Sequence, residues 1–158
     1  MILYDNDFLY SEDIQYIMNL TNNLSLSKVT ADNLYFYGLD ILNSEFDLSP
    51  IKNNIFKKGN FTAARFQKYD ESINQITQYH GHFDIHNYLI FLNDDYEGGE
   101  LEFECGLLIK PKKGSIVYFN NNERHRVRNC IGDRYTLVLS GNIKMEYEYS
   151  IKKHKNVL

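Results

Sequence analysis

The chain of 158 residues suits one domain, and its 43% hydrophobic and 24% charged residues exclude a disordered or membrane-spanning protein. The net charge of −4 argues against a nucleic-acid partner, because that binding usually needs a basic face. The first residues carry acids early and no signal-peptide pattern, and two cysteines, Cys105 and Cys130, make no disulfide framework. We therefore expect no signal peptide, no membrane segment, and a cytoplasmic protein with reduced thiols.

The N-terminal third is expected to be mainly helical. Residues 11–13, a serine and two acids, predict a helix start ahead of an apolar stripe over residues 14–24. A short strand is expected at residues 35–37. The Ser-Pro pair at residues 49–50 predicts a second helix that ends near Gly59. We expect both helices to pack on the outside of a sheet.

From residue 61 the pattern changes to short apolar segments separated by turn residues. Strands are expected at residues 61–69, 73–79, 83–92, 100–104, 106–110, 115–119, 124–129 and 134–140, with an alternating tail at 143–151. About eight short strands at this spacing indicate an antiparallel sandwich or barrel, with the jelly roll as the first candidate.

The fold class that we expect is therefore mainly β (α+β), a double-stranded β-helix (jelly roll) core with N-terminal helices packed on one sheet. The whole chain, residues 1–158, is expected to form a single domain. In it, residues 1–60 are the helical support, residues 61–141 the jelly-roll core, and residues 142–158 a C-terminal strand and tail.

His82-Phe83-Asp84 is the first motif that points to chemistry. Successive residues of a strand point to opposite faces, so His82 and Asp84 would lie on the same side. A third ligand from a later strand would complete two imidazoles and one carboxylate on one face of a metal, the arrangement of non-heme Fe(II) oxygenases. His125, which follows a turn and opens a strand, is the candidate for that ligand.

Arg134 follows His125 by nine residues, across a Gly-Asp turn. Neighbouring antiparallel strands would bring its side chain near the metal, deep in the sheet. An unpaired guanidinium there would be costly, so we expect a carboxylate partner that it binds with its planar fork. Thr136 shares the face of Arg134 and could add a hydroxyl donor.

These motifs, in this order, resemble the 2-oxoglutarate and Fe(II)-dependent oxygenases, in the branch of the prolyl hydroxylases. The resemblance covers about residues 61–141 and rests on residues 79–84, 89–93, 98–103, 111–115, 118–119, 125–127 and 132–135. It implies that His82, Asp84 and His125 bind iron and that Arg134 binds the distal carboxylate of 2-oxoglutarate. It also implies hydroxylation of a C–H bond by O2, with release of succinate and CO2.

The chain departs from the family pattern at several places. Phe91 stands where related hydroxylases often have a tyrosine that helps to hold 2-oxoglutarate, and Thr136 could substitute for it. Tyr69 is the candidate counterpart of a second family tyrosine, while Tyr79 matches the pattern. Ser140 stands near the place where related hydroxylases commonly have a tryptophan. The nucleic-acid demethylases of the family have a second arginine at this position, and its absence here argues against a nucleic-acid substrate.

Several alternatives remain open on the sequence alone. His80 and His86 could be ligands instead, and Asn87 could reach the cosubstrate. His80-Gly81-His82 followed by His125 also suits a cupin-type metalloenzyme, although the glutamate expected in a cupin is missing. A non-catalytic jelly-roll binding or structural protein is the alternative from another class. For an oxygenase, a prolyl residue in a peptide or protein is the first expected substrate, and a small molecule the second.

Overall fold

Antiparallel strands make up most of the chain that can be described. The structure is a computed structural model, and it describes residues 1–22, 25–31, 34–40, 47–52, 56, 61–73 and 78–141. In chain order its elements are β1 (Ile2–Asp5), α1 (Ser11–Asn22), β2 (Ser27–Ala31), β3 (Leu34–Asp40), β4 (Ala63–Tyr69), the 3-10 helix η2 (Glu71–Ile73), β5 (His86–Phe91), β6 (Glu97–Gly98), β7 (Leu101–Phe103), β8 (Leu108–Ile109), β9 (Ile116–Asn120), β10 (His125–Val127), β11 (Cys130–Ile131) and β12 (Arg134–Gly141).

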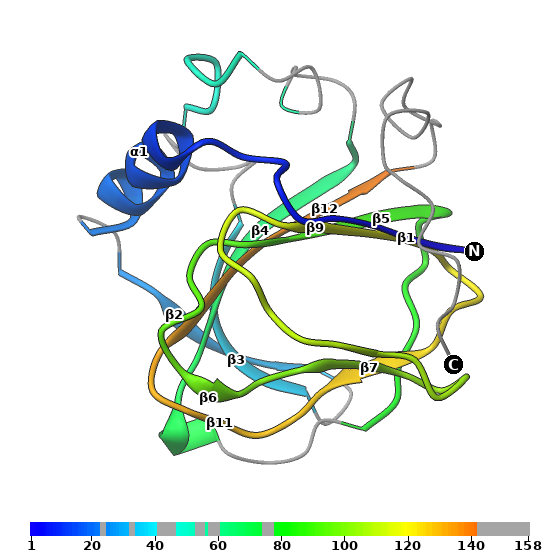
Figure 1. Cartoon of the computed structure of the whole chain (residues 1–158). Coiled ribbons are helices and arrows are strands. Elements are labelled where there is room, and N and C mark those ends of the chain that lie inside the picture. The colour runs from blue at the N-terminus through cyan, green and yellow to red at the C-terminus, as the bar shows by residue number, and fades with distance from the viewer. Residues whose placement is uncertain are drawn as a thin grey trace.

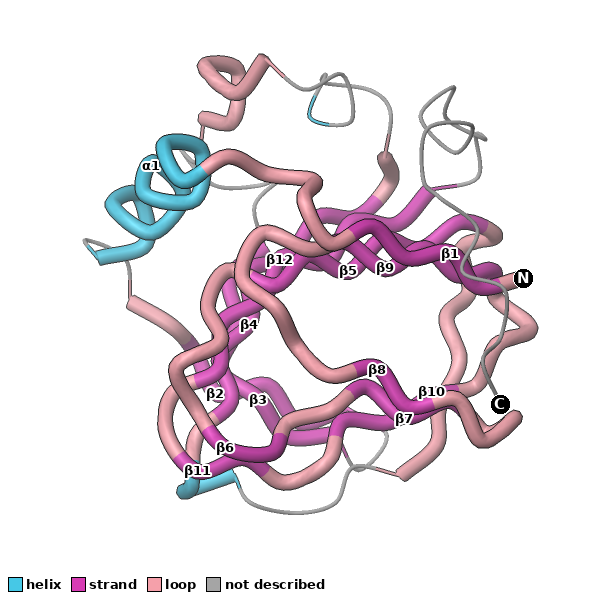
Figure 2. The backbone as a smooth tube through the Cα atoms, in the orientation of Figure 1, coloured by secondary structure: helices cyan, strands magenta, loops and turns pink. Residues whose placement is uncertain are grey.

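Two layers of sheet define the architecture. The larger sheet has seven strands in the order β1-β9-β5-β12-β4-β3-β2, and all neighbouring strands run antiparallel. The smaller sheets, β10-β7-β8 and β11-β6, lie opposite it, as Figure 1 and Figure 2 show. This is the arrangement of a jelly roll. The helix α1 lies outside the larger sheet.

The larger sheet is buried on both faces, which strand β12 illustrates. Leu137 and Leu139 point to an outer core that includes Ile17 of α1. Val138, between them in sequence, points to an inner core that it shares with Phe103 of the smaller sheet. The pleat of one strand therefore divides its side chains between the two cores. The inner core lies between the two layers of sheet.

The first predicted helix is confirmed. The helix α1 begins at Ser11, and Glu12 and Asp13 lie in its first turn, where acids interact favourably with the helix dipole. Ile14 and Ile17, nearly one turn apart, are buried against the larger sheet.

The second predicted helix is not confirmed. Residues 49–50 form a turn and residues 51–52 are irregular, while the rest of the expected helix falls largely outside the described residues. In the part of the chain that is described, α1 is the one α-helix, and no helix there is long and apolar enough to cross a bilayer. The first 60 residues instead add β1, β2 and β3 to the larger sheet.

Most of the predicted strands match the structure, apart from one that its described part lacks and four that it adds. The described part of residues 73–79 contains no strand, because Ile73 ends the 3-10 helix η2 and residues 78–79 are irregular. Strands β1, β2, β6 and β11 were not predicted. Gly98 of β6 pairs with Cys130, and a Cβ at this position would lie 2.2 Å from the Asn129 carbonyl oxygen. The predicted C-terminal strand lies outside the described residues.

We expect Ile17→Ala to destabilise the protein by about 2–5 kcal/mol, because it leaves a cavity between α1 and the sheet. Gln15→Ala on the exposed side of the same helix is the control, with an expected change within about 0.5 kcal/mol. Urea denaturation measures both. A cost for Ile17→Ala no larger than that of the control would contradict the packing described.

Candidate active site

The backbone brings two distant histidines together. His80, in the irregular segment before β5, pairs with His125 at the start of β10, and each amide donates to the other carbonyl at 2.9 Å. Strand β10 pairs in turn with β7, where Phe103 lies opposite His125. The ring centroids of His80 and His125 are 4.4 Å apart as a result.

Three imidazoles meet at this point. The ligand nitrogens of His80, His82 and His125 all lie within 4.8 Å of one another. Nε2 of His82 is 3.3 Å from Nε2 of His125. Two nitrogens held at right angles by one ion, each at about 2.1 Å, are themselves about 3 Å apart. The observed distance therefore suits two ligands of a single metal ion.

Backbone carbonyls orient two of the rings. Nδ1 of His125 lies 3.2 Å from the Glu123 carbonyl oxygen, and Nδ1 of His80 lies 3.2 Å from that of Gln78. A proton on Nδ1 donates to the carbonyl and leaves the lone pair on Nε2. Metal-binding histidines use the same kind of hydrogen bond to fix ring orientation and tautomer.

Burial keeps the three imidazoles neutral. It lowers the pKa of His82 to about 4, and it lowers the pKa of His125 well below its ordinary value. The pKa of His80 is lowered for the same reason. The Phe119 ring, with its centroid 4.5 Å from that of His125, is part of this apolar surrounding. Neutral imidazoles at pH 7 have the lone pair that a metal requires.

Asp84 lies in the same cavity but outside the imidazole cluster. The cavity has a volume of about 410 Å³, and Asp84 lines it together with the three histidines. Its Oδ1 accepts a hydrogen bond from Thr62 Oγ1 at 2.9 Å. Of the predicted ligands, the structure thus brings His82 and His125 together, with His80 as the third donor of the cluster.

Arg134 is fully buried, and its hydrogen bonds are incomplete. Nε donates to the Gly99 carbonyl at 3.0 Å, and Cζ lies 5.2 Å from the ring centroid of Phe91 and 5.4 Å from that of Tyr69. Within the described residues, neither Nη1 nor Nη2 has a hydrogen-bond partner. A buried guanidinium in this state is costly unless an anion completes it.

The two other predicted cosubstrate residues surround Arg134. Tyr69 faces it across the pairing of β4 with β12 and also lines the histidine cavity. Burial raises the pKa of Tyr69 to about 12, so the phenol is protonated at neutral pH. Thr136 is fully buried, and its Oγ1 has no hydrogen-bond partner in the described part of the chain.

Sequence reasoning missed two neighbours of Arg134. Gly99 has φ of +67°, and a Cβ there would lie 2.9 Å from Arg134 Cδ and 2.9 Å from Tyr96 Cε2. Only glycine lets both side chains reach this place. A glycine pair beside a strand was the available signal for Gly99. Nothing in the sequence singled out Tyr96.

His86 and Asn87 have structural roles in the described chain. Nδ1 of His86 lies 2.8 Å from Tyr118 Oη, outside the imidazole cluster. Asn87 is fully buried and donates to the Asp84 carbonyl at 3.0 Å, while its Oδ1 accepts from Ser140 Oγ at 2.8 Å. Asn87 thereby fixes the backbone of Asp84.

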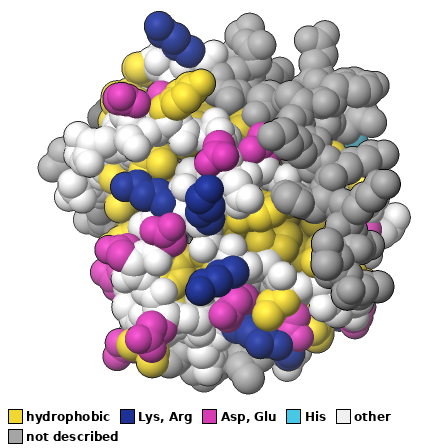
Figure 3. Space-filling view, in the orientation of Figure 1, with side chains coloured by type: hydrophobic (Ala, Val, Ile, Leu, Met, Phe, Trp, Pro, Cys, Tyr) yellow, Lys and Arg dark blue, Asp and Glu magenta, His cyan; other side chains and the backbone are white. Residues whose placement is uncertain are grey.

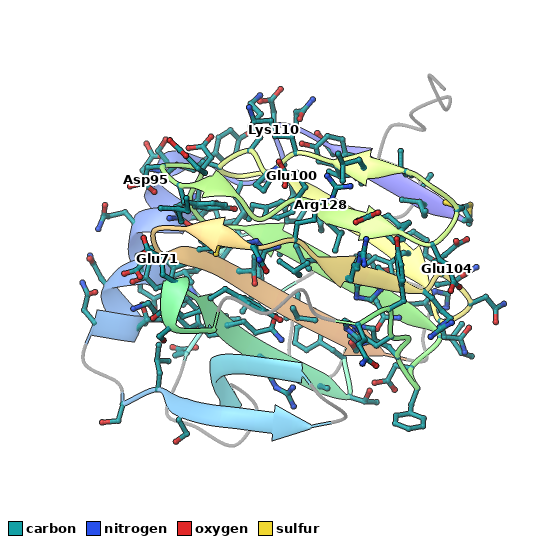
Figure 4. All side chains as sticks on the ribbon, turned by 90° about the horizontal axis from the view of Figure 1, so that it is seen from below. Glu71, Asp95, Glu100, Glu104, Lys110 and Arg128 are labelled. Atoms are coloured by element: carbon teal, nitrogen blue, oxygen red, sulfur yellow. The ribbon has the colours of Figure 1, made fainter. Side chains whose placement is uncertain are left out.

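An ion-pair network on the outer side of the smaller sheet supports the histidine segment. Glu102 accepts from Tyr79 Oη, Arg126 Nε and Arg128 Nε, each at 2.9 Å. The hydrogen bonds from the two arginines lower the pKa of Glu102 to about 2. Figure 4 shows Arg128 beside Glu100, whose carbonyl accepts the Arg128 amide at 2.9 Å. The network attaches the residue before His80 to strands β7 and β10.

The residues fit a metal and an acid. Neutral imidazoles suit iron among other divalent metals, and the unpaired nitrogens of Arg134 with the Thr136 hydroxyl suit a carboxylate. Fold and side chains together fit the class of metal-dependent jelly-roll enzymes.

Comparison with known proteins specifies this class. Residues 64–140 match the family model of the 2OG-Fe(II) oxygenase superfamily, which confirms the resemblance found in the sequence. Fe(II), 2-oxoglutarate and O2 are the cofactors that this superfamily implies, and the donor groups described above fit them. No curated protein matches the sequence.

Solved structures share the fold at low identity. A 2OG-Fe(II) oxygenase-family oxidoreductase of Burkholderia pseudomallei has a TM-score of 0.71 at 15% identity, with 90% of this chain and 88% of that chain covered. A prolyl-4-hydroxylase of Pseudomonas putida has a TM-score of 0.69 at 13% identity, with 90% and 93% covered. A prolyl hydroxylase of Trichoplax adhaerens, in complex with a hypoxia inducible factor peptide fragment, has a TM-score of 0.66 at 18% identity, with 88% and 82% covered.

We expect His125→Ala to weaken Co(II) binding by more than the roughly 10–100-fold that a change outside the ligand set costs. The reason is that His125 is the most buried donor and lies at the centre of the cluster. Co(II) titration followed by absorption measures it. His86→Ala is the control and should leave the affinity unchanged. Equal affinities in the two variants would contradict the site.

Proposed function

We propose that this protein is an Fe(II)- and 2-oxoglutarate-dependent dioxygenase that hydroxylates a C–H bond, with a prolyl residue of a peptide or protein as the substrate. In this proposal His82, Asp84 and His125 bind the iron, and Arg134, Thr136 and Tyr69 bind 2-oxoglutarate. The succinate and CO2 formed from that acid are the coproducts.

One observation carries the proposal: an imidazole cluster and an incompletely bonded arginine lie on the same inner side of one jelly roll. Arg134 and the histidine cavity are both in contact with Tyr69. A metal-binding protein without a cosubstrate would have no use for buried, unpaired guanidinium nitrogens. An acid that reaches from the metal to Arg134 explains both groups.

Each side chain has a stated task in this reaction. Bound Fe(II) would supply the redox chemistry that couples oxidation of 2-oxoglutarate to hydroxylation of the substrate. Arg134 and Thr136 would fix the far carboxylate, so that the reacting end of the acid is held in place. The Phe91 and Phe119 side chains, both buried, keep water from the space between the two sites.

To bind the metal, the Asp84 carboxylate would have to give up its hydrogen bond with Thr62. Its carboxylate now accepts from Thr62, and both residues line the cavity that contains the histidines. The Asp84 carbonyl accepts a hydrogen bond from Asn87, which holds this part of the backbone in place. The three-imidazole cluster itself favours a second candidate, a cupin-type metalloenzyme that would use His80 in place of Asp84.

A peptide substrate is supported by the fold neighbours. The Trichoplax adhaerens prolyl hydroxylase that shares this fold was solved with a peptide fragment. Nucleic acid is disfavoured, because acidic and basic side chains are interspersed on the face in Figure 3 rather than gathered in a basic patch. The net charge of −4 agrees with this.

The direct experiment combines Fe(II), 2-oxoglutarate and O2 with the protein and measures succinate. Proline-containing peptides are then added and their mass followed, since one inserted oxygen atom adds about 16 Da. We expect succinate in every case and the mass shift with a true substrate. Absence of succinate from protein loaded with iron would contradict the proposal.

Replacing Arg134 tests the binding of the acid. Arg134→Ala should raise the 2-oxoglutarate concentration that is needed for half-maximal succinate formation by at least about 30-fold, because a buried charge loses its partner. Arg126→Ala, on the outer side of the smaller sheet, is the control. An unchanged requirement in Arg134→Ala would exclude its assigned role.

A pair of variants decides the third metal ligand. We expect Asp84→Ala to abolish 2-oxoglutarate turnover and weaken Fe(II) binding, while His80→Ala retains turnover and binds Fe(II) within about tenfold of the wild type. Turnover and equilibrium metal titration are both measured. The reverse order of effects would favour the cupin-type ligand set over the one proposed.

A further inference from the structure

Tyr96 has a buried hydroxyl that the account above does not use. It lies just before β6, and its ring belongs to the inner core, where it contacts Gly99 and Gly132. Its Oη is buried and has no hydrogen-bond partner of normal geometry among the described residues. A buried hydroxyl without a hydrogen-bond partner destabilises the folded protein by about 1–3 kcal/mol, so we expect a ligand or an ordered water to bind it.

Tyr96 and Arg134 meet at one glycine. The space of the missing Gly99 Cβ is lined by Tyr96 Cε2 and by Arg134 Cδ, each 2.9 Å from the position that a Cβ would take. Burial raises the pKa of the Tyr96 phenol to about 12, while Arg134 acts in the opposite direction through its positive charge and through a hydrogen bond to the phenol. The phenol is therefore a protonated donor beside the guanidinium.

Four donor groups around Arg134 have no acceptor of normal hydrogen-bond geometry in the described chain, although Arg134 and Tyr96 lie close enough to interact with each other. They are Nη1 and Nη2 of Arg134 and the hydroxyls of Thr136 and Tyr96. Thr136 shares the strand face of Arg134 two residues away, and Tyr96 approaches from β6. A carboxylate has about four acceptor positions on its two oxygens. Its charge and its acceptors match this set better than one water does.

The Phe91 side chain cannot donate a hydrogen bond to an acid bound at Arg134, so a donor has to come from another residue. Its ring centroid lies 5.2 Å from Arg134 Cζ, but its side chain carries no hydroxyl. The Tyr69 ring lies at a similar distance of 5.4 Å from the guanidinium.

We propose that Tyr96 donates a hydrogen bond to the distal carboxylate of 2-oxoglutarate, and so replaces the hydroxyl that Phe91 lacks. This inference rests on the proposed function, because it assigns a further contact to the same cosubstrate. Tyr96 is then a residue that selects acids with a second carboxylate, rather than a residue of the metal site.

The test compares two acids on wild-type and Tyr96→Phe protein. 2-Oxoglutarate has the distal carboxylate, and 2-oxobutyrate lacks it. Their dissociation constants are measured by calorimetry on the Mn(II)-loaded protein without oxygen. We expect Tyr96→Phe to weaken 2-oxoglutarate by about tenfold or more and to leave 2-oxobutyrate within about twofold, because a hydrogen bond to a charged group is lost only with the first acid.

Thermal unfolding without any acid supplies a second readout. An unpaired hydroxyl stabilises nothing in the free protein, so Tyr96→Phe should be at least as stable as the wild type. The matched control is Tyr118→Phe, which removes a buried hydroxyl that lies 2.8 Å from His86 Nδ1. It should lose stability and keep its affinity for 2-oxoglutarate.

Three results would overturn the inference. They are an unchanged affinity of Tyr96→Phe for 2-oxoglutarate, an equal loss for both acids, and a loss of stability in the free variant as large as that of Tyr118→Phe. Failure of the wild-type protein itself to bind 2-oxoglutarate would instead overturn the proposed function, and the contact with it.

Discussion

The buried guanidinium of Arg134 is the constraint on which the rest of the site depends. A permanent positive charge sits in the inner core between aromatic rings, with one hydrogen bond to a carbonyl and two nitrogens without partners in the described chain. A buried charge in this state is costly unless an anion completes it. The Gly99 carbonyl, which accepts from Nε, holds one side of the guanidinium in place.

The histidine cavity is reached from the same face of strand β12 that carries Arg134. Arg134, Thr136 and Val138 share the inner face of β12, and Val138 lines the cavity that contains the histidines. The smaller sheet supplies His125 from the opposite layer, and the backbone pair with His80 brings in the third imidazole. The jelly roll thus holds an imidazole cluster that could bind a metal and a buried arginine that could bind an acid on two sides of one interior.

Much of this could be predicted from local pattern. Strands β4, β5, β9 and β12 are long enough for their apolar pattern to be visible, and helix α1 has its cap and stripe. Strands β6 and β11 have two residues each, and β6 contains a glycine, a residue that is depleted in strands. Their pairing is decided by tertiary contacts that no short pattern records.

The candidate site, like the fold, could be predicted from the sequence only in part. Spacing indicated His82, His125 and Arg134. Strand alternation applies to His125 and Arg134, which open β10 and β12. His82 and Asp84, however, lie before β5 and not in the strand that was expected there. The approach of His80 to His125 and of Tyr96 to Arg134 depends on how distant segments pack. Gly99 permits the second approach because a Cβ there would collide with both side chains. The position of the Asp84 carboxylate, next to Thr62, likewise depends on a neighbour from another segment.

The central claim is that one interior binds the metal and the acid together, and an absorption measurement tests it most directly. Fe(II) and then 2-oxoglutarate are added to the protein without oxygen, and the visible spectrum is recorded after each addition. The account predicts a weak charge-transfer band that appears only when both are present. Absence of that band, with Fe(II) binding shown independently, would contradict it.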